Sequence, residues 1–174
     1  MEDTASRERG GVNEVLEQAQ AWLEEMGWTV QEAPAGEGVA WRLRARNPAG
    51  QSVAAIQQTA RPDLVLLGGS VAPSGPHPDK LAALGAKKMR EFLWDLRFEL
   101  LRQRYQFQIQ GPGIKRVTLN RTLFWDEGVR RSQFVSAVEE IHHGVLTVQW
   151  MIQRLLDESP PPETVKVVGL DPVN

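Results

Sequence analysis

The fold of this chain is decided by residues 105–155, which read YQFQIQGPGIKRVTLNRTLFWDEGVRRSQFVSAVEEIHHGVLTVQWMIQRL. Apolar residues alternate with glutamines over 105–110, which is the two-residue period of a half-buried strand. The Gly-Pro-Gly segment at 111–113 is a turn sequence, and residues 117–125 again carry apolar side chains on one face. The sequence therefore predicts a hairpin here.

A long amphipathic helix is predicted directly after this hairpin. Asp126-Glu127-Gly128 interrupts the strand pattern, so we expect the helix to begin between Asp126 and Ser132. Three consecutive prolines beginning at Pro160 lie beyond its end. Its apolar side chains recur at steps of three and four, at Phe134, Val138, Ile141, Val145, Val148, Ile152 and Leu155.

Toward the N-terminus, the sequence predicts another amphipathic helix followed by three strands. Asn13 is a suitable N-cap for this helix, and Gly27 is suited to end it. Apolar residues alternate with arginines in a first strand near 39–46, and a return strand over 51–59 follows a type I turn sequence. The continuous apolar run 64–71 is typical of a central strand.

The middle helix is predicted to begin near Pro78 and to carry two rows of apolar side chains. A sheet covers only one side of a helix, so the second row packs either against the C-terminal helix or against another subunit. We favour a homodimer interface. Its predicted residues are Trp94, Phe98, Leu101 and Tyr105.

These elements give the order α-β-β-β-α-β-β-α in a single α+β domain over residues 12–158. Trp28–Glu32 is either a further strand or only the lead-in to the first. Strands with one polar and one apolar face are typical of an antiparallel sheet covered by helices on one face. Residues 1–11 are predicted to be a disordered lead-in, and 159–174 a proline-rich tail.

Composition and motifs argue against several kinds of chemistry. The 174 residues include no cysteine, which excludes disulfides and thiolate metal sites. Glu139 and Glu140 each precede a histidine of His142-His143 by three residues. Adjacent histidines on a helix nevertheless point about 100° apart and cannot share a metal. Because no grouping of residues suggests catalysis, we expect a protein that is not an enzyme and needs no metal or cofactor.

The cellular location of the protein and its binding to nucleic acid can be judged from charge and hydrophobicity. The first residues lack the basic and apolar run of a secretory signal, and no apolar run is long enough for a bilayer. We therefore expect a cytoplasmic protein without membrane contact. The formal net charge of −2 also argues against binding nucleic acid through bulk electrostatics.

Two rows of polar side chains are candidates for binding a partner. Arg42, Arg44 and Arg46 share one strand face, and Gln106, Gln108 and Gln110 share another. If these strands belong to one sheet, both rows face away from the helices and form an open polar surface. We expect it to hold a protein segment of acidic and apolar character. The alternative is a nucleic-acid-binding regulatory protein that uses the arginine row.

The order of elements resembles the type III secretion chaperone fold over about residues 12–158. The strand Val117–Trp125, the break Asp126-Glu127-Gly128 and the following helix carry most of this resemblance. It implies a small homodimer that holds a segment of a partner protein and performs no chemistry. The arginine row departs from the acidic character of many such chaperones, so the resemblance favours a chaperone-like binding module over a proven secretion role.

Overall fold

A computed structural model describes residues 2–111, 113–125 and 128–156 of the chain. The helices are α1 (Glu2–Glu25), α2 (His77–Ala83), α3 (Ala86–Arg102) and α4 (Arg131–Leu155). The strands are β1 (Thr29–Glu32), β2 (Val39–Arg46), β3 (Ser52–Gln58), β4 (Arg61–Val71), β5 (Gln106–Gln110) and β6 (Arg116–Phe124). The predicted tail, residues 159–174, lies outside the described residues.

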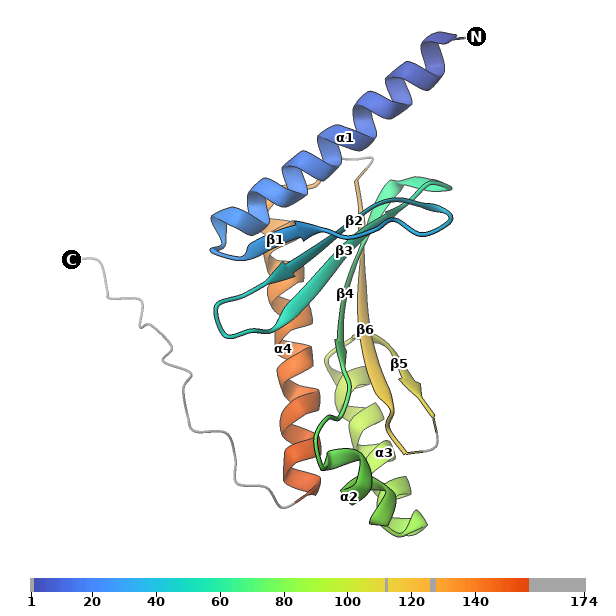
Figure 1. Cartoon of the computed structure of the whole chain (residues 1–174), viewed down its shortest axis with the longest axis vertical. Helices are drawn as coiled ribbons and strands as arrows, with labels where there is room; N and C mark the ends of the chain where they lie inside the picture. Colours follow the sequence, from blue (N-terminus) through green and yellow to red (C-terminus); the bar gives the residue numbers. More distant parts are fainter. Residues whose placement is uncertain (1, 112, 126–127, 157–174) are drawn as a thin grey trace, which may run out of the picture.

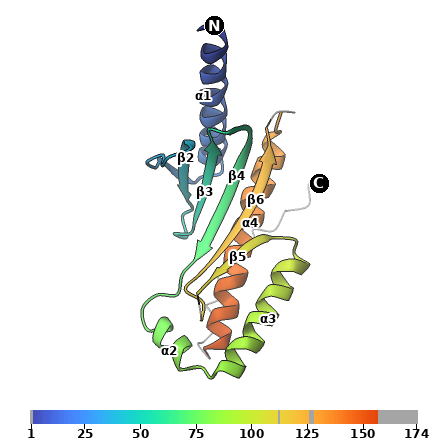
Figure 2. The ribbon, with the colours of Figure 1, turned by 90° about the vertical axis from the view of Figure 1, so that its right-hand side faces the viewer.

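The strands form one antiparallel sheet in the order β1-β2-β3-β4-β6-β5. The helices α1, α3 and α4 pack on one face of it, with α4 crossing β3, β4 and β6 (Figure 1). In Figure 2 the strands β4 and β6 pass in front of α4. The predicted α+β class, with an antiparallel sheet covered by helices on one face, is confirmed.

The ends of the predicted elements differ from the structure at the N-terminal helix. This helix begins at Glu2, so it includes residues predicted to be a disordered lead-in. Residues 2–9 are mostly good helix formers with acidic side chains at the start, a charge order that favours a helix N-terminus. Gly10-Gly11 lowers helix propensity but does not interrupt the helix here. The segment Thr29–Glu32 is a strand at the edge of the sheet.

The predicted middle helix is divided into α2 and α3. Leu84 and Gly85 have extended backbone angles, with ψ of 132° and 151°. Helical hydrogen bonding therefore stops after Ala83, and Gly85 serves as the N-cap of α3. The apolar spacing continued across this break, which is why periodicity alone missed it.

The core lies between the sheet and α4. Apart from the half-buried Leu155, every member of the predicted α4 stripe is buried. Trp22 of α1 stacks on Trp125, with ring centroids 5.6 Å apart, and also contacts Phe134. The Arg131 guanidinium of α4 pairs with the Glu25 carboxylate of α1 at 2.7 Å. These contacts attach α1 to the first turns of α4.

Two glycines allow α4 to approach the sheet closely. A Cβ atom at Gly69 of β4 would lie 2.7 Å from Val145 Cγ2 and 2.9 Å from Ile141 Cγ2. A Cβ atom at Gly144 of α4 would lie 2.5 Å from Leu119 Cδ1. All three distances are far below van der Waals contact, so the packing requires the absence of a side chain at both positions.

We predict that Gly69→Ala destabilises the fold. The added methyl group must displace two buried α4 side chains, and overpacking of this kind costs about 1–3 kcal/mol. The free energy of unfolding, measured by urea titration, is expected to fall accordingly. Gly36→Ala is the matched control because a Cβ atom there meets nothing within 4 Å. Equal unfolding free energies for the two variants would contradict the proposed contact.

Candidate functional site

An uncovered row of large apolar side chains lies on α3. Trp94, Phe98 and Leu101 are 52%, 63% and 60% exposed, and their spacing places them on one side of the helix. The rings of Trp94 and Phe98 stack with centroids 5.8 Å apart, and the Arg97 guanidinium lies over Trp94. Within the described residues, neither α4 nor the sheet covers this row. We call Trp94, Phe98 and Leu101 the α3 row.

Tyr105, predicted to extend this row, lies elsewhere. It is half-buried against α4, where its hydroxyl donates a hydrogen bond to the Glu140 carbonyl oxygen at 2.8 Å. Its ring also occupies the space beside Gly144. The prediction was wrong because the chain leaves the helix after Arg102 and turns through Arg104, which has a φ of 62°. Helical spacing therefore does not carry over to residue 105.

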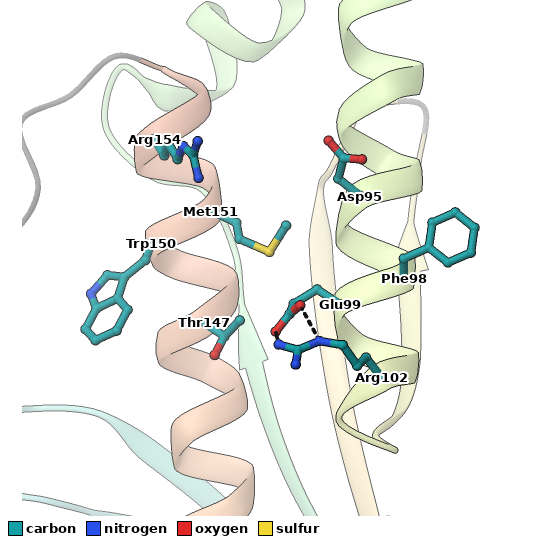
Figure 3. Close-up of a pocket in the computed structure, with 8 residues that line it drawn as sticks. All are labelled: Asp95, Phe98, Glu99, Arg102, Thr147, Trp150, Met151 and Arg154. Atoms are coloured by element: carbon teal, nitrogen blue, oxygen red, sulfur yellow. Dashed lines mark hydrogen bonds and ion pairs between the residues drawn. The ribbon is translucent and has the colours of Figure 1, made fainter.

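A groove between α3 and α4 runs beside the α3 row (Figure 3). It has a volume of about 480 Å³, and a second hollow lined by Lys88, Glu91 and Phe92 continues it. Arg102 holds Glu99 through two hydrogen bonds of 2.7 and 3.0 Å, which lowers the pKa of that carboxyl. The groove is lined by Asp95, Phe98, Glu99 and Arg102 of α3 and by Thr147, Trp150, Met151 and Arg154 of α4.

The aromatic side chains at this groove do not face each other. Met151 extends toward α3, whereas Phe98 and Trp150 point away from the gap on opposite sides (Figure 3). Trp150 is 45% exposed. Apolar side chains are therefore exposed both inside the groove and along its margins. A surface of this kind is suited to binding a second macromolecule.

The predicted arginine and glutamine rows do share the open face of the sheet. Arg44 is paired across the strands with Ala54, then Gly68, Asn120 and finally Gln106. The rows therefore lie four strand steps apart, about 19 Å at 4.8 Å per step. Ala54, Gly68 and the polar Asn120 lie between the two rows.

The three arginines lack acidic partners. Within the part of the chain that the structure describes, no carboxylate lies within ion-pair distance of Arg42, Arg44 or Arg46. Arg46 donates from Nε to the Gly50 carbonyl oxygen at 3.1 Å. Arg121, which the sequence could add to this row, instead faces α4 and pairs with Glu140.

His142 connects α4 to the turn between β2 and β3. Its Nε2 lies 2.6 Å from Gln51 Oε1 and 3.3 Å from Asn47 Nδ2. A protonated Nε2 donates to the Gln51 amide oxygen, whereas an unprotonated Nε2 accepts a hydrogen bond from the Asn47 amide nitrogen. The Trp28 ring meets His142 edge-on at 5.8 Å. The histidine therefore has a structural partner on each side.

Nothing at this histidine pair indicates a metal centre. Among the described residues, no three histidine, aspartate or glutamate side chains are grouped so that they could hold a metal ion. In the same part of the chain, no helix combines the length and the apolarity that a membrane span requires. The α3 row and the open face of the sheet are the candidate functional surfaces.

Comparison with known proteins supplies the family. A family model described as "Uncharacterized conserved protein (DUF2299)" matches residues 15–152. The chain belongs to this family. The fold is shared by a crystal structure described as that of an uncharacterized protein from Methanothermobacter thermautotrophicus. That structure is 26% identical, with a TM-score of 0.73, and the match covers 79% of this chain and 96% of that one.

Two other solved structures are less similar to this DUF2299 protein. A chain of the ExsC–ExsE complex has 13% identity and a TM-score of 0.44, covering 67% of this chain and 78% of its own. YbjN, a putative transcription regulator from E. coli, has 13% identity and a TM-score of 0.40, covering 77% and 90%. No curated protein matches the chain. Nothing about binding follows from similarities at this level, and the chaperone-like functions implied by the resemblance stay predictions.

We predict that His142 makes stability depend on pH. Burial lowers the pKa of His142 and the neighbouring His143 lowers it further, while Glu139 opposes both. The folded state therefore favours the neutral ring. This contribution is complete above the unfolded pKa of about 6.5 and is lost as pH falls through the lowered folded pKa.

The measurement is the urea midpoint at pH values of about 7.5 and 5.0, on either side of the ordinary histidine pKa. Wild type is expected to lose more stability than His142→Gln over this interval. His143→Gln should reduce the loss only in part, because His143 is the second cause of the lowered pKa of His142 and the burial of His142 remains. A decline in His142→Gln as large as in wild type would contradict the prediction.

Proposed function

We propose that this protein is a non-catalytic, homodimeric module that holds a segment of a partner protein. The α3 row is the observation that carries the proposal. Three large apolar side chains, each more than half exposed, lie together on the side of α3 that the rest of the described chain leaves uncovered. Soluble proteins rarely expose such a patch unless it binds something.

A second copy of the chain is the simplest occupant of the α3 row. A two-fold contact uses the same surface on both subunits, so one interface buries the three side chains of each subunit. Transfer of a large apolar side chain from water stabilises a complex by about 1.5–3 kcal/mol before the cost of association. The neighbouring groove provides charged groups of both signs, Asp95 and Arg154 among them, for the rim of such an interface.

Partner binding is assigned to the other side of the molecule. The open face of the sheet carries Arg42, Arg44 and Arg46 without acidic partners, and Gln106, Gln108 and Gln110 at its far edge. A dimer formed through α3 leaves the β2 side of this face accessible, because α3 contacts the opposite edge strand, β5. Self-association and partner binding can therefore occur together.

The alternative, a nucleic-acid-binding regulator, has less support. Proteins that bind single strands through a sheet stack successive bases on several aromatic side chains. Among the described strand residues, Phe124 is the one aromatic side chain on the open face, since Trp41 and Phe107 point toward the helices. Arginines alone give sequence-independent electrostatic binding that weakens steeply with salt.

We predict that the protein is a dimer and that Phe98→Glu dissociates it. Light scattering at concentrations of about 10 μM, where an interface with a Kd near 1 μM is mostly formed, should give twice the chain mass of 19.5 kDa. The glutamate would place two charges in the centre of a two-fold interface without a partner, which raises the Kd at least about 100-fold.

Phe124→Glu is the matched control for this experiment. Phe124 is 60% exposed, nearly as much as Phe98, but lies on the sheet. The control should remain dimeric. A monomeric wild type would refute the homodimer, and a dimeric Phe98→Glu protein would exclude the α3 row as its interface.

A further inference from the structure

The open face of the sheet has a charge opposite to that of the whole chain. Strand alternation and register place Arg42, Arg44, Arg46 and Arg116 on this face. No strand residue on it is acidic, although the complete chain has a net charge of −2. The face is therefore a local basic surface on an acidic protein, and it attracts acidic groups.

An apolar patch lies beside these arginines. Ile56 of β3 is paired with Leu66 of β4, and Leu64 is paired with Phe124 of β6. Phe124 is 60% exposed, and the other three side chains are half-buried although no described helix packs on this face. We call Ile56, Leu64, Leu66 and Phe124 the sheet patch. Exposed apolar side chains on a sheet are stabilised when another chain covers them.

Arg42 joins the patch to the basic row. It is paired directly with Ile56 across β2 and β3, so the guanidinium stem lies about 5 Å from the patch. Its Nε is buried and has no hydrogen-bond acceptor within the described chain. A buried donor without an acceptor costs free energy, and a movement of the Arg42 side chain toward an incoming carboxylate would remove that cost.

The spacing of these groups matches an extended polypeptide. Side chains two residues apart on one strand lie about 6.6 Å from each other, and successive strands of the sheet are about 4.8 Å apart. An apolar side chain over Ile56 and Leu66 therefore leaves the next residue on the same side within reach of a long arginine side chain. Next to these residues, Ala54 and Gly68 are small enough for a backbone to approach the sheet.

We propose that the sheet patch and the arginine row together bind an extended, acidic segment of a partner protein. In this complex a large apolar side chain covers Ile56, Leu66 and Phe124, and carboxylates two residues away pair with Arg42 and Arg44. The inference rests on the proposed partner-holding function and deepens it by naming the anchor. The glutamine row at the far edge of the sheet lies outside the contact.

The test uses the full-length protein and a fluorescein-labelled peptide of about twelve residues, long enough to span the sheet, with a repeated Asp-Ser-Leu-Ser sequence. This order places aspartate and leucine on the same side of an extended chain. Fluorescence anisotropy at a salt concentration of about 150 mM, where surface charges are largely screened, gives the Kd. A Lys-Ser-Leu-Ser peptide of equal length is the control probe.

Two variants separate the parts of the site, and both change exposed side chains. Arg44→Ser removes a charge, and Phe124→Ser removes part of the patch. Each is expected to weaken binding of the acidic peptide at least about tenfold, which is near the lower end of the contribution of one charged hydrogen bond or one large apolar side chain. Trp94→Ser, which removes an exposed aromatic side chain from α3, should leave the Kd for the peptide unchanged.

Several outcomes would overturn the inference. They are the absence of binding at peptide concentrations of about 100 μM, equal binding of the lysine peptide, or an unchanged Kd in Phe124→Ser. Tighter binding of a single-stranded oligonucleotide that depends on Arg44 but not on Phe124 would assign the face to nucleic acid. Light scattering on the same samples reports self-association separately, so loss of the dimer and loss of the peptide site are distinguishable.

Discussion

The close contact between α4 and the sheet is the constraint on which the other features of this protein depend. Because Gly69 and Gly144 carry no side chain, Ile141 and Val145 pack directly against the backbone of β4, and Leu119 reaches the helix. Close packing of this kind fixes the position of α4 along the sheet, because a shift of the helix would bring its side chains into steric conflict with β4 and β6. The contacts from Tyr105 to the Glu140 carbonyl oxygen and from His142 to Gln51 then connect the same helix to the residue before β5 and to the turn between β2 and β3.

The position of α4 divides the molecule into surfaces with different uses. Its buried stripe covers the apolar face of the sheet. As a result, α3 is covered on only one side, and no described helix packs on the opposite face of the sheet. The α3 row and the sheet patch both follow from this shortage of covering elements. They lie on different sides of the fold, so one can serve self-association while the other holds a segment of a partner.

The apolar run Leu64–Val71 shows how a sequence signal can be correct for structure and incomplete for function. A continuous apolar strand is normally buried on both faces, and it predicts the central position that β4 occupies. Here, however, helices cover only the face that contains Val65 and Leu67. Leu64 and Leu66 point to the uncovered face, where register places them beside Phe124 and Ile56. The same strand therefore contributes alternate residues to the core and to the candidate binding surface.

Several features were determined by the sequence by itself, because they depend on local periodicity. The α+β order, the half-buried strands, the α4 stripe and the spacing of Trp94, Phe98 and Leu101 follow from the two-residue and 3.6-residue periods of strand and helix. The arginine and glutamine rows are likewise a consequence of strand alternation. Each of these predictions needs only a residue and its near neighbours along the chain.

Other features were decided only in the tertiary structure, because they depend on which segments meet. Gln57 is fully buried because it accepts a hydrogen bond from Trp41 and donates one to the Pro62 carbonyl. Alternation along β3 does not reveal those partners. Tyr105 left the α3 row because the backbone turns at Arg104 and α4 offers a carbonyl acceptor. Strand order brings Arg42 next to Ile56 and Leu66, since pairing across a sheet joins residues that are distant along the chain.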